Sequence, residues 1–426
     1  MNITEIAAAA KSASIRLAAV DTETKNNALA RIADAIRRRS AEIVAANSRD
    51  LAAAEKDNLA APLLKRLKFD EDKIAQTIAG IESLIKLDDP VGRTITATEL
   101  DAGLELYKVS CPIGVIGVVF ESRPDALVQI STLCLKSGNA VLLKGGSEAA
   151  KTNRVLTDVI AEASENAGLP AGWIQLLETR EDVAAMLALD QYIDLVVPRG
   201  SNEFVRYIMN NTNIPVLGHA DGICHVYVDG EADLEMAVNI AVDSKCQYVA
   251  VCNAAETLLV DAGIAGDFMP KIKAAMEQKG VELRGCERTA AIIDVKPATE
   301  DDWSAEYLDY ILSIKVVDGA DAAIEHINRY GSGHTDAIVT ANKDTAERFM
   351  ALVDSANVLW NCSTRFSDGF RYGLGAEVGI STNKIHARGP VGLEGLLIYK
   401  WRLLGSGQTV ADYSGPNKKK FTHRRI

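Results

Sequence analysis

Cys252 and Asn253 form the part of this 426-residue chain with the clearest capacity for covalent chemistry. They lie between a stretch of helical character, 234–246, and a short apolar stretch, 257–260, that predicts a strand. A thiol at such a junction can face a cleft while its backbone stays anchored, and a helix end or amide dipoles nearby favour the nucleophilic thiolate. The alternative is a buried cysteine that acts as a small apolar side chain. The residues that follow Cys252 must decide between the two interpretations.

The elements before this thiol predict a helical layer followed by a parallel sheet. Leu29, Ile32, Ala33 and Ile36 recur at the spacing of one helix face within the first 90 residues. From residue 113 onwards apolar strands alternate with helices. The predicted strands are 113–120, 140–144, 173–177 and 193–197, and the predicted helices include 125–136 and 148–167. Continuous apolar strands of this kind are typical of a parallel sheet covered on both faces, which binds ligands beyond the carboxyl ends of its strands.

A second alternating block predicts a second α/β domain. Its strands are 225–228, 257–260, 314–317, 335–340 and 358–360, with helices at 234–246, 320–329 and 344–353. Two α/β domains in series indicate an active site in the cleft between them. The stretch 396–404 predicts one more strand, and the basic segment 418–425 is interpreted as a solvated, mobile end. We divide the chain into 1–228, which holds the N-terminal helices and a cofactor domain, 229–375 as the catalytic domain, and 376–426 as the return to the first domain.

Composition excludes several functional classes. The formal net charge of −12 argues against a nucleic-acid-binding surface, and no apolar run approaches the ~20 residues that a membrane-spanning helix needs. The cysteines are Cys111, Cys134, Cys224, Cys246, Cys252, Cys286 and Cys362. Their number is odd and no Cys-x-x-Cys pair occurs, so we expect neither a disulfide framework nor a structural zinc site. A reducing, cytoplasmic location is the natural expectation.

The sequence lacks the usual fingerprint of a dinucleotide-binding site. A Rossmann half usually shows Gly-x-Gly-x-x-Gly after its first strand, and no such string occurs here. Gly114 and Gly117 lie inside a predicted strand and do not replace it. By motif alone, a nicotinamide cofactor is weakly supported.

Longer strings carry a resemblance to a known family. The segment after the thiol, Cys252-Asn253-Ala254-Ala255-Glu256-Thr257-Leu258-Leu259-Val260, resembles the catalytic-thiol segment of the γ-glutamyl phosphate reductases, also called glutamate-5-semialdehyde dehydrogenases. These enzymes are a branch of the aldehyde dehydrogenase superfamily. The same branch is indicated by the strings at 120–124, 361–366, 373–382 and 384–393. The resemblance covers nearly the whole chain and favours the nucleophilic interpretation of Cys252.

The resemblance implies a fold and a reaction. The fold is α/β, with a Rossmann-type cofactor domain, an α/β catalytic domain and a C-terminal oligomerisation strand. The reaction is the NADPH-dependent reduction of L-γ-glutamyl 5-phosphate to L-glutamate 5-semialdehyde through a thioester on Cys252, in proline biosynthesis from glutamate. It further implies a homo-oligomer, with glutamate 5-kinase as the pathway neighbour and with no nucleic-acid or membrane partner.

The resemblance also assigns cofactor residues. They are Lys144, Gly145, Ser147, Glu148, Arg199, Gly200, Ser201 and Glu306. A cation at Lys144 would favour the 2′-phosphate and hence NADPH. The plain alternatives are that Ser147 and Ser201 only cap helices, and that Glu306 is an ordinary exposed carboxylate.

Catalytic and substrate residues follow from the same strings. Besides Cys252, Ser122 or Asn253 could donate to the oxyanion that develops during the reaction. The expected substrate residues are Arg123, Arg365, Arg388 and His219. Guanidinium groups bind phosphate and carboxylate in bidentate fashion, although any one of these arginines alone could be a surface or salt-bridged residue. No metal is expected.

Two departures from the superfamily refine the expected reaction. Most hydrolytic aldehyde dehydrogenases activate water with a Glu, and the corresponding stretch 215–224 contains none. Its absence fits an enzyme whose thioester exchanges with phosphate. Val249 stands where the branch tends to have Pro. The alternatives left open are a hydrolytic NAD(P)-dependent semialdehyde dehydrogenase, which should carry the Glu, and a non-catalytic binding paralogue, which would not need a reactive Cys252.

Overall fold

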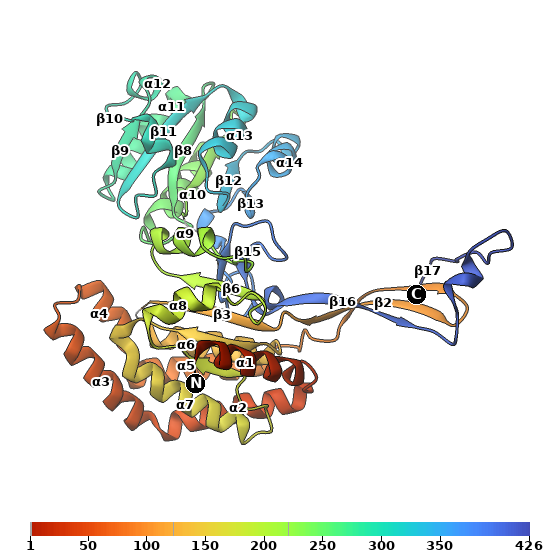
Figure 1. Ribbon diagram of the computed structural model, residues 1–426. Helices are drawn as coiled ribbons and strands as arrows, with labels where there is room; N and C mark the ends of the chain where they lie inside the picture. The colour runs from red at the N-terminus through yellow and green to blue at the C-terminus, as the bar shows by residue number, and fades with distance from the viewer. Residues whose placement is uncertain (1, 122, 220) are drawn as a thin grey trace.

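Two parallel sheets form the centres of two lobes, and a third, antiparallel sheet projects from one lobe as an arm (Figure 1). The computed structural model describes residues 2–121, 123–219 and 221–426. The α/β fold class is confirmed. No described helix combines the length and the apolar character that crossing a bilayer requires.

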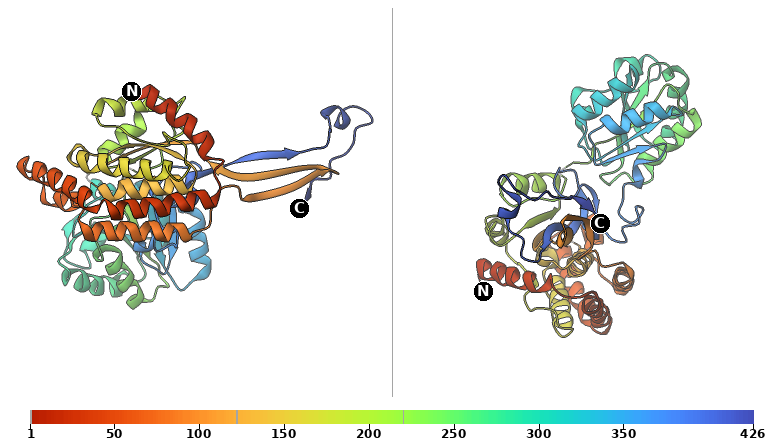
Figure 2. Two further views of the ribbon diagram at one scale, coloured as in Figure 1. Left: turned by 90° about the horizontal axis from the view of Figure 1, so that it is seen from below. Right: turned by 90° about the vertical axis from the view of Figure 1, so that its right-hand side faces the viewer.

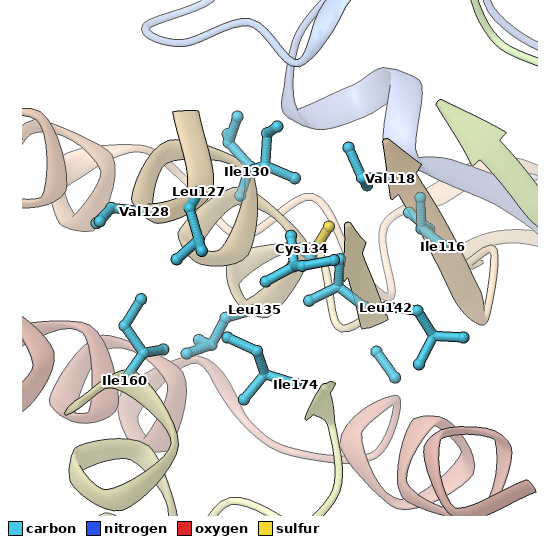
Figure 3. Packing of buried hydrophobic residues seen from close by; sticks show 14 of the residues in the cluster. Ile116, Val118, Leu127, Val128, Ile130, Cys134, Leu135, Leu142, Ile160 and Ile174 are labelled. Atoms are coloured by element: carbon cyan, nitrogen blue, oxygen red, sulfur yellow. The ribbon is translucent and has the colours of Figure 1, made fainter. Parts of the chain in front are cut away.

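The first lobe is built on a four-stranded parallel sheet in the order β5-β4-β3-β6. Its strands are β3 (Val115–Phe120), β4 (Ala140–Lys144), β5 (Ile174–Leu176) and β6 (Leu195–Arg199). Every residue of β3 and β4 is buried, because helices cover both faces of the sheet. Figure 3 shows Ile116 and Leu142 of the sheet packed against Leu127 and Cys134 of the helix that follows β3. The predicted strands of this lobe are confirmed within two residues at each end.

Helices form the outer layers of this lobe. They are α1 (Ile3–Leu17), α2 (Thr22–Arg38), α3 (Ser40–Lys56), α4 (Ala61–Leu67), α5 (Glu71–Lys86), α6 (Pro124–Lys136), α7 (Ala150–Glu165), α8 (Arg180–Leu187) and α9 (Asn202–Asn210). In α2 the predicted apolar face is confirmed, since Leu29, Ile32 and Ile36 are fully buried. Seen from below, the N-terminal helices lie side by side across the lobe (Figure 2).

The second lobe contains a seven-stranded parallel sheet in the order β10-β9-β11-β8-β7-β12-β13. Its strands are β7 (Cys224–Val228), β8 (Ala255–Asp261), β9 (Glu282–Gly285), β10 (Lys296–Pro297), β11 (Ile311–Val317), β12 (Thr335–Val339) and β13 (Asn357–Trp360). The helices between them are α10 (Leu234–Cys246), α11 (Ala265–Glu277), α12 (Glu287–Ala290), α13 (Gly319–Tyr330) and α14 (Lys343–Leu352). The short edge strands β9 and β10 were not expected from the sequence.

The boundary at residue 228 was placed too late. Strand β7 pairs with β8 and β12 of the second sheet, although the division put it in the first domain. The reason is that a short strand buried on both faces suits either parallel sheet, and only long-range pairing decides which sheet takes it. The chain therefore enters the second lobe before Cys224.

The chain then returns to the first lobe and builds the arm. Val378, Val391, Leu393 and Leu396 join the core of the first lobe. A small hairpin of β14 (Gly379–Ser381) and β15 (Gly389–Val391) lies in this return segment. The arm itself contains β1 (Thr94–Asp101), β2 (Leu104–Pro112), β16 (Leu397–Leu404) and β17 (Arg424–Arg425), in the order β16-β2-β1-β17.

Strand β16 confirms the strand predicted at 396–404, whereas β1 and β2 were missed because they contain no continuous apolar run. The basic end is not a free tail. Strand β17 pairs with β1, and Arg424 forms an ion pair with Glu99 at 2.7 Å. The arm thus uses the C-terminal residues to complete its sheet.

Candidate active site

A cleft of about 560 Å³ lies where the carboxyl ends of β3 and β6 face the second lobe. The first lobe contributes the ends of these strands, the second lobe contributes the turn before β8, and the return segment closes the remaining side. Residues that line the cleft include Phe120, Arg123, Arg199, Gly200, His219, Cys252, Asn253, Arg365 and Glu377. A cleft thus lies between the two lobes, where the sequence predicts the active site.

The turn that carries Cys252 connects α10 to β8, as its sequence neighbours indicated. Asn253 anchors this turn through its side chain and through its backbone carbonyl. The Nδ2 amide donates to the Ser367 carbonyl at 2.8 Å, and the Asn253 carbonyl accepts a hydrogen bond from Thr364 Oγ1 at 2.7 Å. Since an N–H of the amide is already bound to Ser367, Asn253 is better placed to hold the turn than to bind an oxyanion.

Gly222 packs against the backbone of Cys252 from the other side. A Cβ atom at residue 222 would lie 2.1 Å from the Cys252 carbonyl oxygen and 2.4 Å from its Cα. No side chain fits at such distances, so this close approach requires glycine. The neighbouring Cys224 thiol donates to the same Cys252 carbonyl at 3.2 Å. The nucleophile segment is therefore fixed between the 222–224 segment and the 363–367 segment.

The Cys252 thiol is protonated at rest. Burial raises its pKa to about 12, and the carboxylates of Glu306 and Glu377 add to this rise. The Cys252 backbone N–H and the Arg199 guanidinium act in the opposite direction but do not compensate. The expectation of a thiolate favoured by nearby dipoles is thus wrong for the ligand-free cleft, because desolvation outweighs them.

Two imidazoles stand beside the thiol. His219 was expected from the sequence, whereas His334 was not, because a lone histidine before a strand carries no motif. His334 is fully buried at the start of β12 and reaches Cys252 only because β12 pairs with β7. A ring nitrogen of each histidine and Cys252 Sγ lie within 4.8 Å of one another. Burial lowers the pKa of both histidines, so both are neutral at pH 7.

Four arginines line the cleft, namely Arg66, Arg123, Arg199 and Arg365. Arg365 is only 8% exposed and donates from Nε to Gln247 Oε1 at 2.9 Å, whereas Arg123 is exposed and pairs with Asp125 at 2.9 Å. Among the described residues, no hydrogen bond or ion pair engages the guanidinium of the half-buried Arg199. Such a desolvated, unpaired cation next to Cys252 is a strong anion site.

Arg388, predicted to bind substrate, does not line the cleft. It donates from Nε to the Thr382 carbonyl at 3.2 Å and from Nη1 to the Asp354 carboxylate at 3.2 Å. The string around it is distinctive in sequence, but its guanidinium joins two segments of the fold. The structure therefore places Arg388 in a structural position.

The expected cofactor residues divide into two groups. Lys144, Gly145, Ser147 and Glu148 lie at the carboxyl end of β4, outside the cleft that holds Cys252. Lys144 is buried and donates from Nζ to the Gly145 carbonyl at 2.5 Å. The alternative role of Ser147 as a side-chain cap is wrong, because its turn is capped by Gly146 without a side-chain hydrogen bond.

Arg199, Gly200, Ser201 and Glu306 lie nearer the thiol. Ser201 caps α9 by accepting from the Phe204 N–H at 3.4 Å, as its plain alternative predicted. Glu306 is half-buried and accepts from Asn202 Nδ2 at 2.6 Å and from the Gly222 N–H at 2.9 Å. It is therefore no ordinary exposed carboxylate, and it joins the first lobe to the loop against Cys252.

Ser122, the second candidate for an oxyanion donor, lies outside the described residues. Glu377 belongs to the string at 373–382, but the sequence assigned no role to this residue. It lines the cleft, accepts the Gly369 N–H at 2.8 Å, and burial raises its pKa. Sequence reasoning missed it because glutamates are common and this one has no motif of its own.

Comparison with known proteins places these features in a family context. The aldehyde dehydrogenase family profile matches residues 1–296. The chain is 67% identical to a γ-glutamyl phosphate reductase of Pelotomaculum thermopropionicum, over 100% of this chain and 98% of that protein. It is 65% identical to that of Acetivibrio thermocellus, over 100% and 99%. The crystal structure of a γ-glutamyl phosphate reductase from Thermotoga maritima, 42% identical, superposes with a TM-score of 0.94 over 96% of this chain and 100% of that one.

The raised pKa of Cys252 predicts how its alkylation depends on pH. Only the thiolate reacts, and below a pKa of about 12 its fraction grows roughly tenfold for each pH unit. The rate constant for iodoacetamide at Cys252, followed by mass spectrometry, should therefore rise from pH 7 to pH 10 without levelling off. Free cysteine, with a pKa of about 8.5, is the control that should level off. A plateau below pH 9 at Cys252 would contradict the assignment.

Proposed function

Because the chain belongs to the aldehyde dehydrogenase family, and within it to the γ-glutamyl phosphate reductases, we propose that its cleft reduces L-γ-glutamyl 5-phosphate to L-glutamate 5-semialdehyde. This oxidoreductase reaction belongs to proline biosynthesis from glutamate. The observation that supports the substrate is the position of one thiol, Cys252, among four arginines in a single cleft. The substrate offers what these groups require, namely an acyl carbon for the thiol and two anionic ends for the guanidinium groups.

The reaction uses Cys252 as the nucleophile. The thiol loses its proton as its sulfur forms a bond to the acyl carbon. The bond from that carbon to the phosphate oxygen breaks, the leaving phosphate takes up the proton, and a thioester remains. NADPH, when bound, supplies the hydride that converts the thioester into a thiohemiacetal. Collapse of the thiohemiacetal releases the aldehyde and returns a proton to Cys252. The Cys252 backbone N–H, which already acts on the sulfur in the resting site, is our first candidate for an oxyanion donor.

Substrate binding is assigned to the arginines of the cleft. Arg199 is the first choice for the phosphate, because it is desolvated, unpaired among the described residues and close enough to influence the Cys252 thiol. Arg365 and Arg123 lie on other sides of the same cleft and suit the α-carboxylate. This proposal assigns Arg199 to substrate binding, whereas the resemblance assigned it to cofactor binding.

The cleft also disfavours hydrolysis of the thioester. Asp221 is the carboxylate within the stretch 215–224, which contains no Glu. Its carboxylate is bound by the Arg206 guanidinium and by Asn202 Nδ2, and it does not line the cleft. Glu377 does line the cleft, but one oxygen of its carboxylate is already bound by the Gly369 N–H at 2.8 Å. We therefore expect the thioester to react with phosphate much faster than with water.

The reverse reaction tests this proposal. With glutamate semialdehyde and NADP⁺ but no phosphate, we expect one burst of about one NADPH per active site, followed by stalling. Added phosphate should restore steady turnover, and Cys252→Ala should abolish both phases. Steady phosphate-free turnover that yields glutamate would identify a hydrolytic dehydrogenase instead. In that case Glu377→Gln should stop it, because Glu377 is a half-buried carboxylate of the cleft whose charge acts on Cys252.

We further propose NADPH rather than NADH as the reductant. Lys144 ends β4, and in the turn that follows Asn153 and Glu148 approach Gly145 and Gly146 so closely that a Cβ on either glycine would overlap them. Asn153 also holds a buried Oδ1 without a partner among the described residues. These features fit the approach of an adenosine ribose and its 2′-phosphate. Cytoplasmic location agrees with this metabolic role.

Lys144→Ala tests the choice of cofactor. A charge-assisted contact with the 2′-phosphate contributes about 1.5–3 kcal/mol, on the order of 10- to 100-fold in affinity. NADPH binding, measured by fluorescence titration, should weaken by that factor while NADH binding stays nearly unchanged. Lys151→Ala, which removes an exposed lysine from the neighbouring helix α7, is the matched control. Equal losses for both cofactors would assign Lys144 a structural role.

The arm is proposed to join two copies of the chain. Seven of the eight residues of β16 are exposed, and Tyr399, Trp401 and Leu403 are each at least half exposed. Apolar side chains gathered on a projecting strand are unfavourable in water and are typical of an interface. A second copy of the chain would cover them.

Trp401→Glu combined with Leu403→Glu tests the arm. The added charges should shift the protein to a smaller assembly in size-exclusion chromatography with light scattering. Ile15→Glu, at a 70% exposed position on α1, is the control and should leave the mass unchanged. An arm variant that keeps the mass of the original protein would exclude β16 from the interface.

A further inference from the structure

The cluster of His219, Cys252 and His334 has the composition of a metal site. One ring nitrogen of each histidine and the cysteine sulfur lie within 4.8 Å of one another. Within residues 2–121, 123–219 and 221–426, no other group of His, Cys, Asp and Glu meets this spacing. Thiolate and imidazole together are the preferred ligands of Zn²⁺.

Hydrogen bonds orient both imidazoles for such a role. His219 Nδ1 lies 3.0 Å from the Ile380 carbonyl, which can only accept, so His219 carries its proton on Nδ1 and its lone pair on Nε2. His334 Nδ1 lies 2.8 Å from Thr335 Oγ1, whose hydroxyl donates to Ser367 Oγ at 2.8 Å. Thr335 therefore accepts from His334, which leaves the lone pair on Nε2 of His334 as well.

Within the part of the chain that the structure describes, His334 Nε2 has no hydrogen-bond partner, although its side chain is fully buried. A buried nitrogen with an unused lone pair costs stability unless something binds it. The two outer hydrogen bonds are of the kind that fixes metal-binding histidines in other proteins. The carboxylates of Glu306 and Glu377 act on the same thiol and favour a cation there, while Arg199 opposes it.

We propose that His219, Cys252 and His334 bind Zn²⁺ reversibly and that the ion switches the enzyme off. The ion forms bonds to the cysteine sulfur and to the two Nε2 atoms, and the thiol proton leaves to solvent. Tetrahedral geometry requires ligand separations of about 3.3–3.5 Å, so the donors approach one another by roughly an ångström. The site is inhibitory, since the ion occupies the sulfur that the substrate needs.

Inhibition rests on the catalytic role proposed for Cys252, whereas binding does not. The three donors come from three segments that the fold holds together independently of any substrate. Hard cations such as Mg²⁺, which prefer oxygen ligands, should not compete. The proposal therefore concerns Zn²⁺ and chemically similar ions.

The test is a competition between the full-length, reduced protein and a chromophoric chelator for Zn²⁺, without substrate or cofactor. One ion should bind per chain. Cys252→Ala, His334→Asn and His219→Asn should each weaken binding by about 100-fold or more, since even outer-shell changes cost on the order of 10- to 100-fold. Co²⁺ in place of Zn²⁺ should show a thiolate charge-transfer absorption that Cys252→Ala removes.

His326→Asn is the matched control. His326 is also buried with an unpartnered Nε2, but it lies outside the cluster, so its variant should bind Zn²⁺ normally. Thermal melting checks that His334→Asn still folds, and the half-buried His219 gives a second, milder variant. Unchanged affinity in the Cys252 and His334 variants, or the absence of stoichiometric binding, would overturn the site. Zinc binding without loss of turnover would overturn its inhibitory role and the catalytic role of Cys252, but not the site itself.

Discussion

The anchoring of the turn between α10 and β8 is the constraint on which the active site depends. Two hydrogen bonds from the 363–367 segment hold Asn253, and Gly222 packs directly against the Cys252 backbone. The same 363–367 segment brings Arg365 into the cleft. One set of contacts thus fixes the nucleophile and places a guanidinium beside it, which pre-organises both for a substrate with a carbonyl and an anion.

Desolvation sets the charge states of the groups in the cleft. Burial keeps the thiol protonated, keeps the two histidines neutral and leaves Arg199 without a counter-ion among the described residues. The neutral thiol and imidazoles are the forms that burial favours, whereas the unpaired charge of Arg199 is costly until an anionic ligand binds. The unpaired guanidinium thus favours the binding of anionic ligands, and it lowers the local stability of the ligand-free cleft.

The division of labour between lobes follows from the same geometry. Parallel strands end in one edge, so β3 and β6 of the first lobe present Arg123 and Arg199, while the second lobe presents the thiol. Glu306 connects the two by binding Asn202 of the first lobe and the Gly222 backbone beside Cys252. A change in the relative orientation of the lobes would therefore shift the backbone beside Cys252.

Much of the fold and part of the site follow from the sequence alone. Apolar periodicity located the buried strands and helices, because side chains buried on both faces leave a local signal. The string after Cys252 indicated the family and a candidate nucleophile. The tertiary structure decided what depends on long-range pairing. It moved β7 into the second sheet, joined β17 to β1, placed Arg388 outside the cleft and brought His334 and Glu377 into contact with the site. The pKa of Cys252 also belongs to this class, since burial and the charges of distant residues are set only when the chain has folded.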